Sequence, residues 1–243
     1  MTEARPAFYA LAPGGWREYV TLLHPPYTLW HLSYVALGAA LAADELPWVR
    51  LAALLAAFLL AMGVGAHALD ELNGRPLGTE ISKQALWALA GTSIAGAVAI
   101  GIWASLQWTP WLLAFVAAGL FIVVAYNLEL FGGRFHGDGW FAAAWGAFPV
   151  LTAYLAVAEE LRLEAAAAAA YAYLASRAQR ALSTQARTVR RRAASVSGEI
   201  LLRDGGTEPL TAEILVSPAE TALRALAGAS VALAIALILL RLG

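Results

Sequence analysis

The chain has 243 residues, of which 60% are hydrophobic and 14% are charged, and its mean hydropathy is +0.65. Soluble domains are about 45–50% apolar, so this composition excludes an ordinary soluble protein and indicates a membrane protein. The chain has no cysteine, which excludes disulfides, thiolate metal sites and a cysteine nucleophile, and its net charge of −1 gives no support for a nucleic-acid partner.

Apolar segments of membrane-spanning length recur along the chain. The N-terminal stretch lacks the basic and apolar regions of a signal peptide, so none is expected. His24-Pro25-Pro26 then ends one segment and starts the next, because proline favours the first turn of a helix. A helix needs about 20 apolar residues to cross a bilayer. The predicted spans are residues 27–43, 49–69, 85–106, 111–130, 139–158, 161–174 and 223–240. The sequence therefore predicts an all-α, polytopic membrane bundle of seven transmembrane helices.

The sixth span is the least clear, because residues 161–174 are few and rich in alanine. They could instead form a helix that lies on the membrane surface. With seven spans and a cytoplasmic N-terminus, only Arg50, Arg162 and Arg241 of the 16 Lys and Arg residues fall outside, leaving 13 inside. This asymmetry follows the positive-inside rule and predicts a cell-membrane protein whose C-terminus lies outside.

We interpret the chain as a single transmembrane domain, 1–243, with a cytoplasmic insertion at 175–222 before the last span. The insertion begins with a basic helix, which either lies on anionic headgroups or only fixes the topology. Asp204-Gly205-Gly206, between two short apolar runs, predicts a hairpin.

Polar residues cluster in two loops that this topology places at the cytoplasmic face. On a helix that continues from the second span, His67, Asp70 and Glu71 share one face. The second loop follows the fourth span and contains Asn127, Glu129, His136 and Asp138. Buried or interfacial polar groups are costly in a membrane, so such a cluster is a candidate site.

Carboxylates from two loops at the mouth of a bundle suit Mg²⁺, which is often held by one or two carboxylates and substrate phosphates. Arg75, Lys83 and Arg134 carry charge complementary to a diphosphate. The alternative interpretation is that these residues, with Glu80 and His136, are solvated turn residues and interfacial anchors.

Three stretches resemble the UbiA superfamily of intramembrane prenyltransferases, over roughly residues 20–155. They are HPPYTLWHLSYVALGAALA, the acidic loop leading into RPLGTEISKQAL, and YNLELFGGRFHGDGWFAAAWGAFPVLTAY. In that family an aspartate-rich loop precedes an Arg-Pro-Leu and Ile-Ser pattern, and a second loop carries a tyrosine and further acids.

The resemblance implies Mg²⁺-dependent prenyl transfer, or cyclisation, of a polyprenyl diphosphate held at the cytoplasmic mouth. The resemblance implies residues for three roles, and Asp70 and Glu71 have two of them. They are Asp70, Glu71 and Tyr126 for catalysis; Asn73, Arg75, Lys83, Asn127 and Arg134 for the diphosphate; and Asp70, Glu71, Glu129 and Asp138, with His67, for metal.

The sequence also departs from the family's first motif, N-D-x-x-D-x-x-x-D. Alignment on Asp70 puts Ala66, His67 and Gly74 at its other three acidic or amide positions, and seven spans replace the usual nine. Two alternatives therefore stay open. One is a degenerate protein that binds an isoprenoid lipid or a partner, and the other is an enzyme that uses a transition metal bound by His67 and His136.

Overall fold

The computed structural model describes residues 5–242, and nearly all regular structure in this range is helical. Three of the helices continue through π-helical turns: α3–η1–α4, α7–η2–α8 and α9–η3. In chain order the elements are α1 (Trp16–Leu22), α2 (Pro25–Leu41), α3 (Trp48–Phe58), η1 (Leu59–Ala66), α4 (His67–Leu72), α5 (Lys83–Gln107), α6 (Leu112–Asn127), α7 (Asp138–Ala142), η2 (Ala143–Ala147), α8 (Phe148–Ala158), α9 (Leu163–Arg187), η3 (Thr188–Arg192), β1 (Glu199–Leu201), β2 (Thr207–Pro209) and α10 (Ala212–Leu240).

Four helices in the described range are long and apolar enough to cross a membrane: Trp48–Leu72, Lys83–Gln107, Asp138–Ala158 and Ala212–Leu240. The mean hydropathy of their most apolar windows lies between 1.6 and 2.3. Helices α2 and α6 are shorter, at 17 and 16 residues, and α9 carries many polar groups. The predicted class, an all-α membrane protein, is confirmed at this level.

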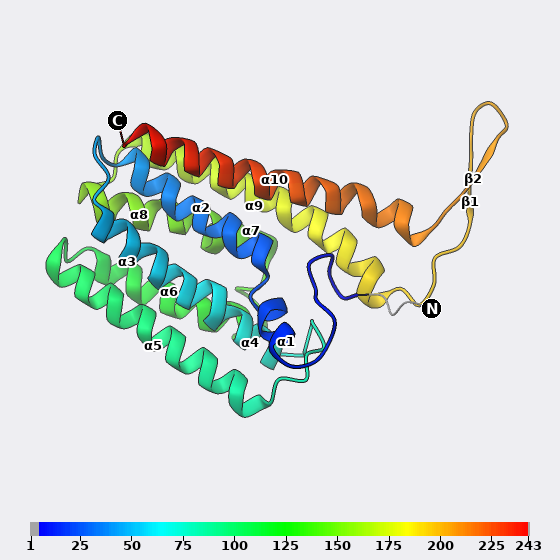
Figure 1. The fold of residues 1–243 in the computed structure, drawn as a ribbon, viewed down its shortest axis with the longest axis horizontal. Helices are drawn as coiled ribbons and strands as arrows, with labels where there is room; N and C mark the ends of the chain where they lie inside the picture. The colour runs from blue at the N-terminus through cyan, green and yellow to red at the C-terminus, as the bar shows by residue number, and fades with distance from the viewer. Residues whose placement is uncertain (1–4, 243) are drawn as a thin grey trace.

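The long helices run alternately in opposite directions and form one elongated bundle (Figure 1). Helix α2 lies in its middle and packs against α3, α8, α9 and α10. Most of its residues from Trp30 to Ala40 are buried, as expected of a helix with neighbours on several sides. Gly38 allows this packing, because a β-carbon at that position would overlap the carbonyl oxygen of Val150 in α8.

A second close contact joins η2 to α9. A β-carbon on Gly146 would lie 2.5 Å from the carbonyl oxygen of Ala172 and 2.6 Å from Ser176 Oγ. Ala165, Ala169 and Ala172 are buried on the same side of α9. The alanine-rich segment is therefore packed lengthwise against the bundle through small side chains.

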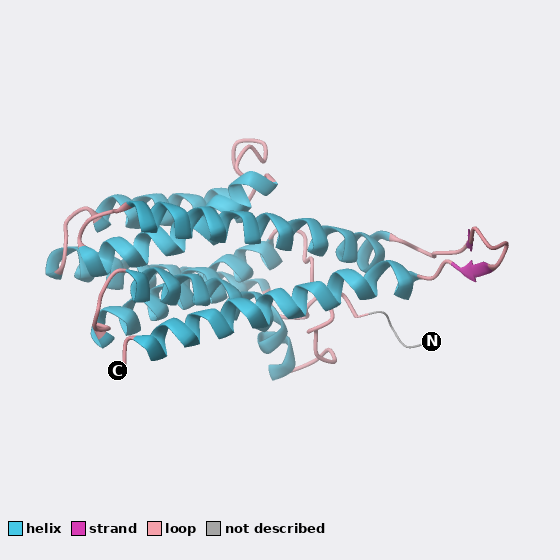
Figure 2. Cartoon of the chain, turned by 90° about the horizontal axis from the view of Figure 1, so that it is seen from above, coloured by secondary structure: helices cyan, strands magenta, loops and turns pink. Residues whose placement is uncertain are grey.

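The insertion differs from its predicted extent. The basic segment continues α9, as expected, and then leads into an antiparallel hairpin in which Ile200 faces Glu208. This predicted hairpin is confirmed, and it extends beyond the helix ends along the bundle axis (Figure 2). Helix α10, however, begins at Ala212 and not at residue 223, because Thr211 Oγ1 caps it by accepting from the Ile214 amide at 3.3 Å. Pro218 is accommodated inside this helix.

Candidate functional site

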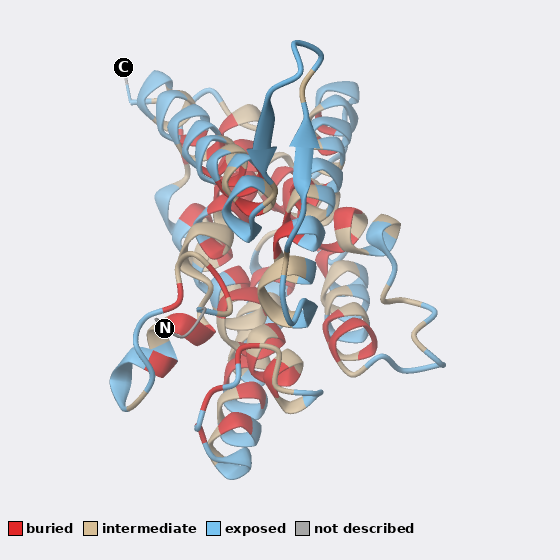
Figure 3. Ribbon diagram, turned by 90° about the vertical axis from the view of Figure 1, so that its right-hand side faces the viewer, coloured by how far each residue is buried: buried red, intermediate tan, exposed pale blue. Residues whose placement is uncertain are grey.

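A polar cavity of about 290 Å³ lies at the end of the bundle where α2 begins and where α4 and α6 end. Figure 3 views the protein from this end. The wall contains all four histidines of the chain, with acidic and basic side chains from several helices. These residues are His24, His31, His67, His136, Asp70, Glu129, Glu220, Arg180, Arg187, Arg190 and Arg191. Such a gathering of polar groups in an apolar chain marks the cavity as the candidate site.

His24 and His67 stack face to face in the wall, with ring centroids 4.1 Å apart and an angle of 11° between the rings. His24 Nδ1 lies 2.9 Å from Tyr9 Oη, and the backbone of His24 is left-handed, with φ 47°. His67 follows the π-helical turns of η1, and its Nδ1 donates to the carbonyl oxygen of Gly63 at 3.0 Å. A neutral His67 held in this way keeps Nε2 as a hydrogen-bond acceptor.

Burial, followed by the proximity of His67 and two arginines, holds the pKa of His24 well below its ordinary value of 6.5. Its imidazole is therefore neutral at pH 7. Burial also raises the pKa of Tyr9 above its ordinary value. These two groups therefore meet as neutral partners, and the positive charge of the cavity comes from its arginines.

Tyr126 lies at the inner side of the cavity, near the end of α6, with only 4% of its surface exposed. Its ring packs against those of His136 and Trp145, at centroid distances of 4.4 and 4.8 Å. Its hydroxyl is buried and has no hydrogen-bond partner within residues 5–242. An unpaired buried hydroxyl costs about 1–3 kcal/mol, so this group is suited to bind a ligand. His136 Nδ1 donates to the Tyr126 carbonyl oxygen at 2.9 Å and fixes the second loop against α6.

Other predicted site residues join Tyr126 in the lining. Asp70, Asn73, Asn127 and Glu129 all face the cavity. Asn73 Nδ2 donates to the carbonyl oxygen of Asn127 at 3.2 Å, which connects the ends of α4 and α6. The prediction that the two polar loops lie at one end of the bundle is therefore confirmed.

Glu71 is completely buried but does not line this cavity. Its carboxylate accepts from the amides of Leu77 and Thr79 at 3.0 and 2.8 Å, and from Thr79 Oγ1 at 2.9 Å. Glu71 thus holds the loop between α4 and α5 in place. Its predicted role as a metal ligand would require it to leave all three donors.

Four more predicted residues lie outside the lining. Arg75 donates to the carbonyl oxygens of Thr79 and Ile81 within its own loop. Lys83 and Arg134 are exposed on the surface, where loop and helix ends meet solvent. Asp138 is engaged by Arg180, whose Nε lies 2.9 Å from Oδ1.

Of the carboxylates predicted to bind metal, Asp70 and Glu129 therefore remain available. Within the described part of the chain, no three His, Asp or Glu side chains are close enough to hold a metal ion together. The residues present do not fit the carboxylate cluster that the family resemblance implies.

The basic segment was expected either to lie on anionic headgroups or to fix the topology, but four arginines of α9 and η3 line the cavity. Arg180, Arg187 and Arg191 are spaced by seven and four residues, which puts them on one helical face. The sequence therefore contains the spacing that predicts a shared helical face. It does not show what this face contacts, because the other walls of the cavity come from residues far away in the sequence.

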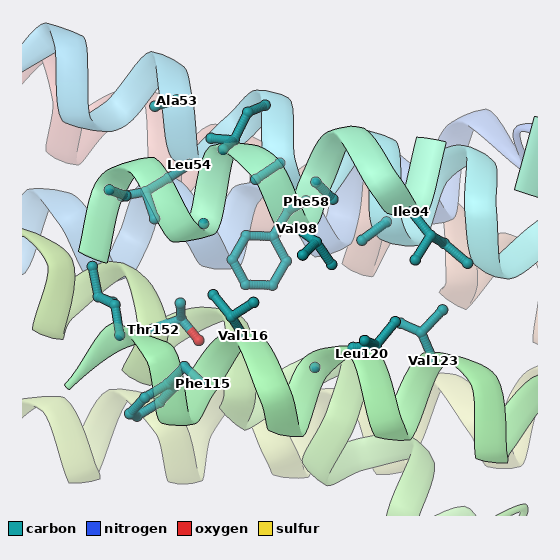
Figure 4. A pocket seen from close by; sticks show the side chains of 18 of the residues that line it. Ala53, Leu54, Phe58, Ile94, Val98, Phe115, Val116, Leu120, Val123 and Thr152 are labelled. Atoms are coloured by element: carbon teal, nitrogen blue, oxygen red, sulfur yellow. The ribbon is translucent and has the colours of Figure 1, made fainter. Parts of the chain in front are cut away.

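An apolar pocket of about 100 Å³ lies deeper in the bundle, between α3, α5, α6 and α8 (Figure 4). Thr152 is its one hydroxyl-bearing residue, and that hydroxyl donates to the carbonyl oxygen of Phe148 at 2.7 Å. Val123 lines this pocket and Tyr126, one turn further along α6, lines the polar cavity. On the helix 138–158, Phe148 lines the apolar pocket and Trp145, one turn away, lines the polar cavity. Polar and apolar spaces thus follow one another along two helices.

Comparisons with protein-family models, with curated protein sequences and with solved structures gave no match for this chain. Its function is therefore inferred from the polar cavity, the apolar pocket and their order along α6.

Proposed function

We propose that the protein is a membrane enzyme of the UbiA type, which binds a polyprenyl diphosphate and transfers or cyclises its prenyl group. The observation that carries this proposal is the succession of the two spaces along α6, polar at Tyr126 and apolar at Val123. A prenyl diphosphate has the same polarity profile, an anionic head followed by an apolar chain. The arginines of the cavity complement the head, and the pocket among α3, α5, α6 and α8 complements the chain.

The expected reaction begins when the allylic C–O bond breaks and its electron pair stays on the departing diphosphate. Cationic side chains stabilise that charge, and the apolar pocket keeps water from the carbocation. Tyr126, Phe141 and Trp145 pack against one another and line the polar cavity, where their rings can stabilise the cation. The carbocation then bonds to a nucleophilic acceptor or to a double bond of its own chain, and a proton is lost.

Seven membrane crossings belong to the same proposal, with α2, α6 and α9 as the additional spans. The alternation of the helices and the positive-inside bias together support a cytoplasmic cavity. The loops that resemble the two acidic loops of the family both lie at this end.

The test uses purified protein in nanodiscs with geranylgeranyl or farnesyl diphosphate, in Mg²⁺ and in EDTA. We expect release of pyrophosphate, and we expect Tyr126→Phe to reduce its rate about 10–100-fold because the unpaired hydroxyl is lost. Tyr173→Phe, on α9 outside both spaces, is the matched control and should keep wild-type turnover. Thermal stabilisation without release would favour the isoprenoid-binding alternative. The absence of both stabilisation and release would reject the proposal.

A second candidate is a transition-metal enzyme that uses His67 and His136, both of which line the cavity. Elemental analysis of the purified protein tests it. A stoichiometric metal that is lost in His67→Ala would support this candidate over the prenyl diphosphate enzyme.

A further inference from the structure

Arg187 and Arg191 differ from the other arginines of the cavity because neither forms an ion pair within residues 5–242. Arg187 Nε donates to the Ser183 carbonyl oxygen at 3.2 Å, and its Nη2 lies 3.3 Å from Thr184 Oγ1. Arg191 Nε donates to the carbonyl oxygen of Pro6 at 3.0 Å. A guanidinium has five N–H donors, so most of the donors on both side chains stay available.

The neighbouring arginines show the contrast. Arg190 Nη2 lies 2.8 Å from Glu220 Oε2, and Arg224 reaches the same carboxylate at 3.9 Å. Arg180 is paired with Asp138 at 2.9 Å. Arg187 and Arg191 are therefore the arginines of the wall that make no ion pair within the described residues, and Asp70 and Glu129 are the carboxylates that line the wall with them.

The two free arginines also stand in an unfavourable position relative to each other. They are four residues apart at the junction of α9 and η3, where like charges on one helical face repel. Both are partly shielded from solvent, and the segment Pro6–Tyr9 lies against the same cavity. Partial exclusion of water lowers the local dielectric constant, which strengthens the repulsion between the two guanidinium groups. It equally strengthens the attraction of both groups to an anion bound between them.

We propose that Arg187 and Arg191 form an oxyanion clamp for a diphosphate, and that this clamp binds its ligand without a divalent metal ion. The clamp supplies the charge that a carboxylate-bound Mg²⁺ cluster would otherwise supply, and it occupies a cavity whose remaining carboxylates do not form such a cluster. Arginine is suited to this role because its planar fork binds phosphate oxygens in pairs. The identity of the ligand as a prenyl diphosphate rests on the proposed function, whereas the anion site rests on the arginines.

The test measures two probes on the full-length protein in nanodiscs by calorimetry, each in Mg²⁺ and in EDTA. The probes are geranylgeranyl thiodiphosphate, whose bridging sulfur slows cleavage, and inorganic pyrophosphate. The variant is Arg187→Gln with Arg191→Gln. Its matched control, Arg177→Gln with Arg192→Gln, removes two exposed charges from the same helix.

We expect EDTA to change the wild-type Kd by less than about threefold, and the clamp variant to weaken binding about 100-fold, roughly tenfold for each lost charge-assisted contact. The control variant should bind like the wild type. If the glutamine variant does not fold, Arg187→Lys with Arg191→Lys keeps the charge and removes the fork, and it should bind about tenfold more weakly.

Loss of binding in EDTA, or equal binding by the clamp and control variants, would overturn the inference. Arginine-dependent binding of pyrophosphate alone would support the clamp and reject the prenyl diphosphate as ligand. If the wild type binds neither probe under either condition, both the clamp and the proposed function are rejected.

Discussion

At the scale of single residues, Glu71 shows how a carboxylate near a site can serve the fold. Its three hydrogen bonds satisfy two loop amides and a hydroxyl in a fully buried position. Glu71→Gln removes the charge and turns one donor toward the loop amides, so we expect a loss of about 2–3 kcal/mol of unfolding free energy. Thermal unfolding in detergent measures this loss. Glu80→Gln, an exposed change in the same loop, is the control, and equal melting of both variants would contradict the structural role.

At the scale of helices, the close packing of α9 against η2 positions the helical face that carries Arg180, Arg187 and Arg191. Gly146→Ala would place a methyl group 2.5 Å from the Ala172 carbonyl oxygen, so the helices must separate, at a cost of about 1–3 kcal/mol. Gly91→Ala in α5 meets no atom within 4 Å and should instead gain roughly 0.5–1 kcal/mol of helix stability. Melting temperatures that shift in opposite directions would check this prediction. A Gly146→Ala variant as stable as the wild type would contradict the close packing.

At the scale of the whole molecule, the topology can be tested cleanly because the chain has no cysteine. Single cysteines can therefore be introduced without background labelling. Asp204→Cys in the hairpin should react with an impermeant maleimide only after the cell membrane is opened. Glu160→Cys, in the turn between α8 and α9, should react in intact cells. Reaction of both from the same side would contradict the alternating arrangement.

The sequence predicted local features more closely than it predicted contacts between distant segments. The prolines after His24 and the Asp204-Gly205-Gly206 turn were identified because their conformational preferences are local. Asp70 and Tyr126 were expected at the same end of the bundle because topology brings their two loops together, and both line the cavity there. The hydrogen bonds between Glu71 and its loop, and the position of Arg187 in the cavity wall, depend on tertiary packing. No local sequence pattern predicts such packing.

The segment Pro6–Tyr9 has a kinetic consequence for any ligand of the cavity. It lies across the polar end, with Arg191 bound to the Pro6 carbonyl and Tyr9 bound to His24. Under the proposed function, an anion released from the cavity leaves beside this segment, which forms part of the lining. Under the proposed function we expect the opening of the N-terminal segment to limit product release, so that the first catalytic cycle runs faster than those that follow.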